Sequence, residues 1–260
     1  MAVRQSSNGL STSDIQALRR AYSETMSLRD ERGYHYFAGI HGLPLPVFCQ
    51  HGNLLFLPWH RAYLYFFELA LQDRVPGVAI PWWDWISDEA HAQGMPPIFS
   101  DRAISVQPNP FFDAEFDWDR DLVARVRQEP GLRGTMTGGT RPRTRRDQDV
   151  PDELPRKRTI DDILQAPTFE DFSSRLETPH GMVHVWVGGS MSQVPTAAYD
   201  PIFWSHHSMV DRLWYLWQMN HRSISLPPSL LNEALPPFSV TVGQMLDISR
   251  LGYDYAVQVT

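Results

Sequence analysis

The sequence contains a single cysteine, Cys49, among its 260 residues. One cysteine excludes an internal disulfide, so cysteine usage does not indicate the redox compartment. No uninterrupted apolar run approaches the roughly 18 residues of a membrane-spanning helix, and the N-terminus lacks the apolar stretch of a secretory signal. The net charge of −7 argues against general binding to nucleic acid. We therefore expect a soluble chain, cytoplasmic rather than secreted, whose partners include neither nucleic acid nor membrane.

Aromatic side chains are plentiful: the chain has nine Trp, nine Tyr and thirteen Phe. Its hydrophobic content of 42% and charged content of 20% are ordinary for a folded protein. The rings indicate a core and a pocket built from aromatic groups. Neither an internal repeat nor a long linker divides the chain, so we predict one domain over residues 1–260.

Hydrophobic periodicity predicts a mainly α-helical fold, with a helical bundle core, long irregular loops and little β-structure. Ser11 followed by Asp14 suits the start of a first helix. Further helices are expected at 58–73, 159–165, 168–177 and 178–186, and from Asp200 onward, with Asp200 as N-cap and Pro201 in the first turn. Irregular structure is expected at 39–46 and 91–159. Within the latter, residues 141–158 carry seven basic and four acidic side chains, which is typical of a mobile surface loop; a lid over a pocket is the alternative.

The ten histidines matter by position rather than by number. His180 and His184 are four residues apart, so on a helix they project from one face and could hold one metal ion. His206 and His207 point about 100° apart on a helix. Periodicity favours His207 as the inward-facing residue, although the stripe through His206 is also fairly apolar.

His60 heads another apolar stripe, within a segment at 48–66 that is otherwise almost wholly apolar or aromatic. Any one of these histidines could be a hydrogen-bonded core residue. Several buried imidazoles on different helices favour a common explanation, because an unpartnered buried ring costs free energy. A shared centre of copper, zinc or iron is one such explanation. The lack of a second cysteine and of an H-E-x-x-H helix disfavours the common zinc patterns.

Five stretches occur in a distinctive order: "GIHGLP" at 39–44, "CQHG" at 49–52, "LPWHRAYL" at 57–64, "PHGMVHVWVGG" at 179–189 and "DPIFWSHHSMVDRLW" at 200–214. Together they resemble the signatures of tyrosinases and related polyphenol oxidases, which are type 3, or binuclear, copper proteins. The resemblance runs from the first helix to the end of the chain. There, Tyr253 and Tyr255 are similar to the Tyr-x-Tyr element that closes the catalytic domain in this family.

The resemblance implies two copper ions, each held by three histidines. The ligands that it implies for the two ions are, respectively, His41, His51 and His60, and His180, His184 and His207. In the "HH" pair of this motif the second histidine is the ligand, which agrees with the periodicity. His35 lies one or two helical turns from His41 and is the alternative to it. The remaining candidates are assigned as structural or surface residues: His35, His91, His206 and His221.

Three further features follow from the resemblance. In fungal members a cysteine placed like Cys49 is joined to the histidine ring by a thioether, so a cross-link between Cys49 and His51 is implied; a free buried thiol is the alternative. Phe203 is expected to pack on a ligand ring. Val185 is expected at the pocket entrance, where an apolar side chain offers no charge to select acidic substrates.

The activity implied is the oxidation of o-diphenols (catechols) to o-quinones with O2 as co-substrate, and ortho-hydroxylation of monophenols is left open. The most active hydroxylating members place Asn or Asp directly after the first histidine of the second set, where it acts with a nearby glutamate on the incoming phenol. Glu177 matches that glutamate, but the position after His180 is Gly181, which has no side chain. Because a phenol with a pKa of about 10 is poorly ionised at neutral pH, hydroxylation should be slowed more than catechol oxidation.

Two other hypotheses stand beside the oxidase. One is an oxygen-binding protein like haemocyanin, which has the same six-histidine centre without turnover; the other is a module whose histidines are only core residues. The sequence lacks the additional shielding domain of haemocyanin units, which disfavours the first and predicts an open pocket. The ordered motifs disfavour the second. A copper chaperone as partner and the oligomeric state are left open by the sequence.

Overall fold

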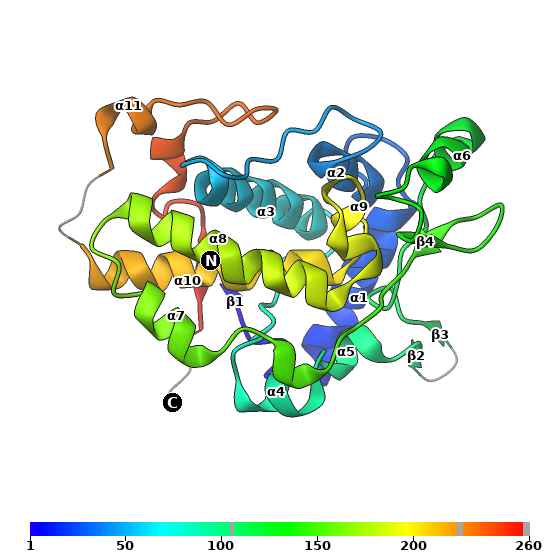
Figure 1. Cartoon of the computed structure of the whole chain (residues 1–260), viewed down its shortest axis with the longest axis horizontal. Coiled ribbons are helices and arrows are strands. Elements are labelled where there is room, and N and C mark those ends of the chain that lie inside the picture. The colour runs from blue at the N-terminus through cyan, green and yellow to red at the C-terminus, as the bar shows by residue number, and fades with distance from the viewer. Residues whose placement is uncertain (105–106, 223–225, 257–260) are drawn as a thin grey trace.

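The computed structural model describes residues 1–104, 107–222 and 226–256, and it is mainly helical (Figure 1). The α-helices are α1 (Thr12–Ser27), α2 (Tyr34–His41), α3 (Phe56–Gln72), α4 (Asp88–Gln93), α5 (Pro97–Ser100), α6 (Arg120–Gln128), α7 (Lys157–Ile163), α8 (Phe169–Val187), α9 (Val194–Ala197), α10 (Ile202–Asn220) and α11 (Pro228–Leu231). Short 3-10 turns are η1 (Pro151–Glu153), η2 (Gly189–Ser192) and η3 (Val242–Met245).

Strands are few and short in the described part of the chain. They form a parallel pair, β1 (Ala2–Arg4) with β6 (Tyr253–Tyr255), and two antiparallel pairs, β2 (Ala103–Ile104) with β3 (Gln107–Pro108) and β4 (Met136–Thr137) with β5 (Arg143–Thr144). The prediction of a mainly α fold with little β-structure is confirmed. Among the described residues no helix combines the length and the apolar character needed to cross a bilayer.

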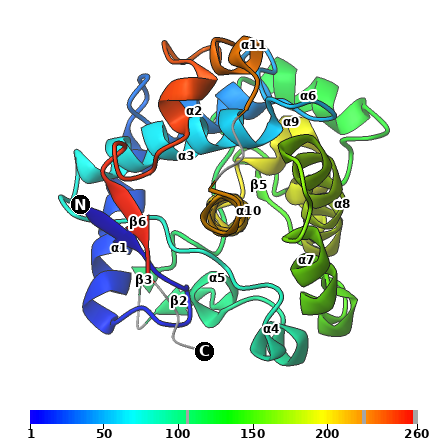
Figure 2. The same cartoon turned by 90° about the vertical axis from the view of Figure 1, so that its left-hand side faces the viewer.

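Helix α10 lies at the centre of the molecule, and Figure 2 views it nearly end-on with α3 and α8 beside it. Its sequence explains this position, because every side chain from Ile202 to Asp211 is buried. The first half of α3 is similar: every side chain from Phe56 to Leu64 is buried. Helices that are apolar on all sides belong in the interior of a protein. His60 and His207 lie within these two stretches and are therefore carried into the core.

Helix starts were the most predictable local feature. Ser11 and Asp14 form the capping box expected for α1, each side chain accepting a hydrogen bond from the other residue's backbone N–H. Asp200 accepts from the backbone N–H of Ile202 at 3.1 Å, so it caps α10 as predicted, although the helix is assigned to begin after Pro201. Helix α3 begins two residues before the predicted Pro58, a difference within the usual uncertainty of helix ends.

Sequence reasoning missed the short helices α4, α5, α9 and α11 and the longer helices α2 and α6. The segment around Gly39 and Gly42 was predicted to be irregular, but α2 forms there because Phe37, Ile40 and neighbouring side chains pack into the core. Helix α6 lies inside the stretch 91–159, also predicted to be irregular. The Asp119 side chain caps it by accepting from the backbone N–H of Leu122 at 2.7 Å. Tertiary burial outweighed weak helix propensity in α2.

Helix α8 is continuous where two helical segments were predicted. Pro179 lies inside it and has no N–H to donate to the Arg175 carbonyl, so one helical hydrogen bond is missing. The helix persists because residues on both sides of the proline, among them Leu176 and Val183, are fully buried. As a result His180 and His184 share one rigid helix with Glu177.

Residues 141–158 run along α8 and α10. The backbone N–H of Asp147 donates to the carbonyl of Val187 at 2.9 Å, and the Trp186 indole donates to the carbonyl of Val150 at 2.8 Å. Arg146 donates through Nε to the buried Asp200 carboxylate at 2.7 Å. These bonds hold this charged segment to the two helices that carry the second histidine set.

A buried ion network joins the two ends of the described chain. The carboxylate of Asp211, one turn after His207 on α10, accepts from Arg61 Nε at 2.5 Å and from Arg4 Nη1 at 3.1 Å. The hydroxyls of Tyr253 and Tyr255 donate to the same carboxylate at 2.7 and 2.6 Å. The Tyr-x-Tyr element therefore ties β6 to α10, and Arg4 ties β1 to it. Arg61 likewise joins α3 to α10 through Asp211.

Candidate metal centre

The histidines assigned from the sequence come together in two neighbouring groups. Within each group the possible ligand atoms all lie within 4.8 Å of one another. The groups touch each other, since the rings of His60 and His207 are stacked with centroids 4.3 Å apart and an interplanar angle of 7°. The first group is His41, His51 and His60, and the second is His180, His184, His206 and His207.

In the first group, two imidazoles are fixed by backbone carbonyls. His41 ends α2, and its Nδ1 bonds the carbonyl of Val194 at 3.0 Å. His60 lies on α3, and its Nδ1 bonds the carbonyl of Phe56, one turn earlier, at 2.8 Å. A carbonyl only accepts, so each Nδ1 carries the proton and each Nε2 presents a lone pair. Both Nε2 atoms are buried without a hydrogen-bond partner, as expected for ligands aimed at a metal.

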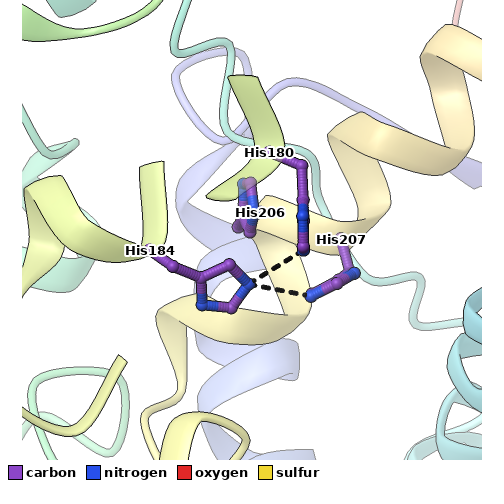
Figure 3. A group of neighbouring side chains, drawn as sticks. All are labelled: His180, His184, His206 and His207. Carbon is purple, nitrogen blue, oxygen red and sulfur yellow. Dashed lines mark hydrogen bonds between the residues drawn. The ribbon is translucent and has the colours of Figure 1, made fainter. Parts of the chain in front are cut away.

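The second group shows the same pattern more clearly. Nδ1 of His184 bonds the carbonyl of Met191 at 2.9 Å, and Nδ1 of His180 lies 3.3 Å from the carbonyl of Glu177. Nε2 of His184 lies 3.1 Å from Nε2 of His180 and 3.2 Å from Nε2 of His207. Dashed lines mark these two contacts in Figure 3. With the protons on Nδ1, the His180 and His184 lone pairs point at each other, which is unfavourable without a cation between them. The spacing suits an ion with metal–nitrogen bonds of about 2 Å.

Burial keeps these rings neutral, which is the form that binds metals. It lowers the pKa of His41, His60, His180 and His207 well below the usual value and that of His184 to about 4. Burial also lowers the pKa of His51, where the nearby Glu177 carboxylate acts in the opposite direction. Neighbouring imidazoles add to the effect, because protonating one ring opposes protonating the next.

The metal-free protein should therefore lose stability as the pH falls. Below pH 6.5, the ordinary pKa of histidine, the unfolded chain takes up protons on imidazoles that stay neutral in the fold. The unfolded state then binds more protons, so stability declines with falling pH. Each such ring contributes up to about 1.4 kcal/mol per pH unit. We expect the free energy of unfolding, from urea titrations without metal, to drop by at least about 2 kcal/mol between pH 7.5 and 5.5; an unchanged value would contradict the neutral, buried histidine groups.

His206 was assigned from the sequence as a structural residue, and the structure places it beside the second group. Its ring is fully buried and lies parallel to the His180 ring, with centroids 5.2 Å apart and an interplanar angle of 14°. Neither of its ring nitrogens has a hydrogen-bond partner. Only His207 of the pair brings a nitrogen within 3.2 Å of His184 Nε2, so the geometry favours His207 as the ligand.

Aromatic rings enclose the two groups. Phe203 is fully buried, and its ring centroid lies 4.2 Å from that of His207 and 4.8 Å from that of His41. It therefore packs against one histidine ring of each group. Phe56 was not singled out from the sequence, yet its ring lies 4.8 Å from that of His180 and 5.1 Å from that of His60. Its position at the start of the α3 stripe was the signal that could have identified it.

A cavity of about 320 Å³ opens onto the histidine groups. Val185 is 71% exposed and is one of the residues that line it; its role at the entrance stays a prediction. Glu177 lines the cavity and is held by the backbone N–H of Gly52, which donates to its Oε1 at 2.7 Å. A Cβ added at Gly181 would meet no other atom within 4 Å. The lining residues are His41, His51, Glu177, His180, Gly181, His184, Val185, Met191, Ser192, Val194 and Ala197.

Cys49 lies beside His51, with Sγ 3.7 Å from the ring Nδ1. Burial raises the pKa of the Cys49 thiol to about 12, so little thiolate is present at neutral pH. The thiol is therefore close to the ring but unreactive by itself. The cross-link stays a prediction.

The other histidines serve different contacts. Nε2 of His91 lies 3.2 Å from the carbonyl of Pro155, and Nδ1 of His221 lies 3.0 Å from the carbonyl of Trp217. The half-buried His35 packs its ring 5.9 Å from that of Tyr34 and 6.4 Å from that of Tyr199. The cluster near α2 contains His41, not its alternative His35.

Two sets of neutral imidazoles, buried, side by side and reached by a cavity, suit a pair of copper ions, because imidazole is a ligand for copper. Comparison with known proteins points the same way. The common central domain of tyrosinase matches residues 31–220. The tyrosinase of Streptomyces lincolnensis is 33% identical over 215 residues, which cover 72% of this chain and 74% of that protein.

Haemocyanins are similar as well. A G-type haemocyanin of Enteroctopus dofleini is 31% identical over 255 residues, covering 92% of this chain. The chain spans only 8%, 22% and 40% of the length of three haemocyanins that it matches. Among solved structures, a functional unit of octopus haemocyanin superposes with a TM-score of 0.82 at 28% identity, covering 99% of this chain and 68% of that one.

A tyrosinase from Burkholderia thailandensis has the same fold. It superposes with a TM-score of 0.77 at 21% identity, covering 100% of this chain and 75% of that one. The domain match covers most of the chain, and the Streptomyces relative is matched over most of its own length. The chain therefore belongs to the tyrosinase family of type 3 copper proteins.

Proposed function

We propose that this protein is a copper-dependent polyphenol oxidase that converts catechols to o-quinones with O2. Two catechols and one O2 give two quinones and two water molecules. Copper, when bound, supplies the electron transfer that amino-acid side chains cannot perform. In this proposal the ligands of the two ions are, respectively, His41, His51 and His60, and His180, His184 and His207.

The protein's own contribution is orientation and exclusion of water. The backbone carbonyls of Val194, Phe56 and Met191 fix which nitrogen of each bonded ring faces the centre. Phe203 and Phe56 pack against the rings and keep the core side dry. The cavity admits a substrate ring from the opposite side, past Val185. Fixed ligands and a dry wall favour redox chemistry over side reactions.

The cavity is the observation that supports an oxidase most directly. Its volume of about 320 Å³ falls in the range of small-molecule sites, and its lining includes four of the six proposed ligands. An oxygen carrier needs room only for O2. The similarity to haemocyanins keeps oxygen binding without turnover as the second candidate.

Proton handling separates the two substrate classes. Glu177 is the carboxylate in the cavity, and in this proposal it accepts the proton from an incoming phenol. Gly181, one turn further along α8, offers no polar group to hold a water between that carboxylate and the substrate. Catechols ionise more readily than monophenols, so catechol oxidation should be the faster reaction.

A matched pair of substrates tests this function. We expect copper-loaded protein to oxidise 4-methylcatechol rapidly and 4-methylphenol slowly, as followed by quinone absorbance at the same concentrations. Comparable initial rates would show that Glu177 or another base suffices without a second polar group. No turnover of either compound by protein with two bound copper ions would contradict the oxidase and support oxygen carriage.

Gly181→Asn should raise the monophenol rate relative to the catechol rate by about tenfold, because the amide would complete the site for an ordered water. The open space around the glycine Cβ position accommodates the side chain. Gly181→Ala is the control, since it adds a Cβ without a polar group. An equal increase in both variants, or in neither, would contradict a role for the missing polar group.

Copper loading in air should join Cys49 to His51. A bond forms between Sγ and a ring carbon, the S–H and C–H bonds break, and the two electrons and two protons pass to O2. The intact protein should become lighter by two hydrogen atoms, and its thiol should resist alkylation after denaturation. The metal-free protein is the control, because its buried thiol has a raised pKa. A fully alkylated cysteine after loading would rule out the cross-link.

A further inference from the structure

Charged side chains are scarce around the cavity. Its lining residues come from residues 41–51 and 177–197. The sequence has no Asp, Glu, Lys or Arg from residue 33 to 60, and none from 178 to 199. Among the residues that the structure describes, Glu177 is therefore the only charged side chain that lines the cavity. The rest of the wall is neutral imidazole, aliphatic or thioether side chains, and one hydroxyl.

A backbone hydrogen bond holds the Glu177 carboxylate in a defined position. Its Oε1 accepts the backbone N–H of Gly52 at 2.7 Å, and its side chain is only partly buried. Among the described residues no arginine or lysine lies within ion-pair distance of this carboxylate. The nearest basic residue on α8, Arg175, forms ion pairs with Asp162 and Asp171 instead. In the described part of the chain, no cationic side chain therefore offsets the charge of Glu177 at the cavity.

The orientation expected for a bound phenol places its ring substituent where it can interact with the Glu177 carboxylate. A phenol whose oxygen faces the histidine groups turns the opposite ring position toward the mouth. There the rim consists of Val185, 71% exposed, and Val194, 40% exposed. A carboxylate in that position would lose hydration without gaining a cation. An ammonium would keep its exposure to water and gain attraction to Glu177 and to a chain with a net charge of −7.

We infer that the site selects its substrates by charge, preferring phenols and catechols with an aminoalkyl substituent over those with a carboxyalkyl substituent. This inference rests on the proposed function and names its substrate class. The specificity-determining features are the lone carboxylate of Glu177 and the absence of a cationic side chain on the lining, with Val185 as the position where a cationic side chain would reverse the preference.

Three catechols of similar size test the inference: dopamine, 4-ethylcatechol and dihydrocaffeate, which are cationic, neutral and anionic at neutral pH. We expect kcat/KM for dopamine to exceed that for dihydrocaffeate by about tenfold at low salt, with the neutral compound between them. The ratio should shrink as salt screens the interaction. Equal values, or a preference for dihydrocaffeate, would overturn the inference.

Val185→Lys should bring the ratio of kcat/KM for dopamine to kcat/KM for dihydrocaffeate close to one or invert it. Each kcat/KM is divided by that for 4-ethylcatechol in the same variant. Met219→Lys is the matched control, because it changes the net charge equally at an exposed position on α10. It lies 12 residues from His207, about 18 Å along the helix, which exceeds the screening length of about 8 Å at 0.15 M salt, the condition for this comparison. An equal change in both variants would show that net charge, and not the rim, sets the preference.

Binding without turnover separates this inference from the proposed function. Ligand-observed NMR on the copper-loaded protein can compare phenethylamine, which is cationic like dopamine, with 3-phenylpropanoate, which is anionic like dihydrocaffeate. Neither compound has a reactive hydroxyl. Tighter binding of phenethylamine, lost in Val185→Lys, would support the inference even if no quinone forms. Failure of 4-ethylcatechol to react would count against the oxidase alone. Equal binding of the two compounds would overturn charge selection.

Discussion

His207→Ala should reduce the bound copper from two ions per chain to about one and lower the rate of quinone formation at least about 100-fold. Loss of residues that merely orient a ligand already costs 10- to 100-fold in metal affinity or activity, and this change removes a ligand itself. In the structure Nε2 of His207 faces Nε2 of His184 at 3.2 Å, so its removal opens the second group. Copper content by elemental analysis and catechol oxidation rates provide the two measurements.

The adjacent His206 provides the matched control. It is as deeply buried as His207 and lies on the same helix, but no nitrogen of its ring makes such a contact. His206→Ala should therefore keep two copper ions, although it removes a ring packed on His180. If His206→Ala loses the copper while His207→Ala keeps it, the assignment within the pair is wrong.

Asp211→Asn should lower the free energy of unfolding by about 3–5 kcal/mol, because breaking a buried ion pair leaves its partners charged and uncompensated. The carboxylate is the acceptor for Arg61, Arg4 and the hydroxyls of Tyr253 and Tyr255. Burial acts to raise its pKa, but Arg61 and Arg4 outweigh burial, so the pKa lies below the ordinary value. The fold therefore stabilises the ionised form of the Asp211 carboxylate.

Urea unfolding of the metal-free protein measures this effect without interference from copper. Glu24→Gln is the control, since its ion pair with Arg20 is a surface pair on α1, with side chains 40% and 69% exposed. Such pairs contribute about 0–1 kcal/mol. If Asp211→Asn lowers the free energy of unfolding by less than about 1 kcal/mol, the Asp211 network does not stabilise the attachment of β1 and β6 to α10, contrary to what the structure indicates.

The fold could be predicted where local signals agree with burial. Helix α1 follows its capping box, and α10 follows Asp200 and Pro201. Helix α2 could not be predicted, because Gly39 weakens its helical signal and only packing against the core overrides it. Helix α6 carried a usable signal in Asp119 and the spacing of Leu122 and Val126, which the surrounding charges obscured.

For the site, spacing alone singled out His180 and His184 and favoured His207 over His206. The complete set of proposed ligands came from the resemblance to tyrosinases and not from periodicity. The carbonyls that fix the rings could not be predicted, because every residue has a carbonyl and only the fold brings that of Val194 to His41. The scarcity of charged residues at 33–60 and 178–199 was visible in the sequence, but its meaning became clear only when α8 and the 41–51 segment were seen to face one cavity.

The most direct measurement of the central claim is a copper titration in a sealed oxygen-electrode cell with excess 4-methylcatechol. The account predicts that O2 consumption rises with added copper, levels off at two ions per chain, and consumes one O2 for every two quinones formed. Metal-free protein should consume none. Protein that binds two copper ions and takes up O2 reversibly, without forming quinone, would contradict the account and identify an oxygen carrier.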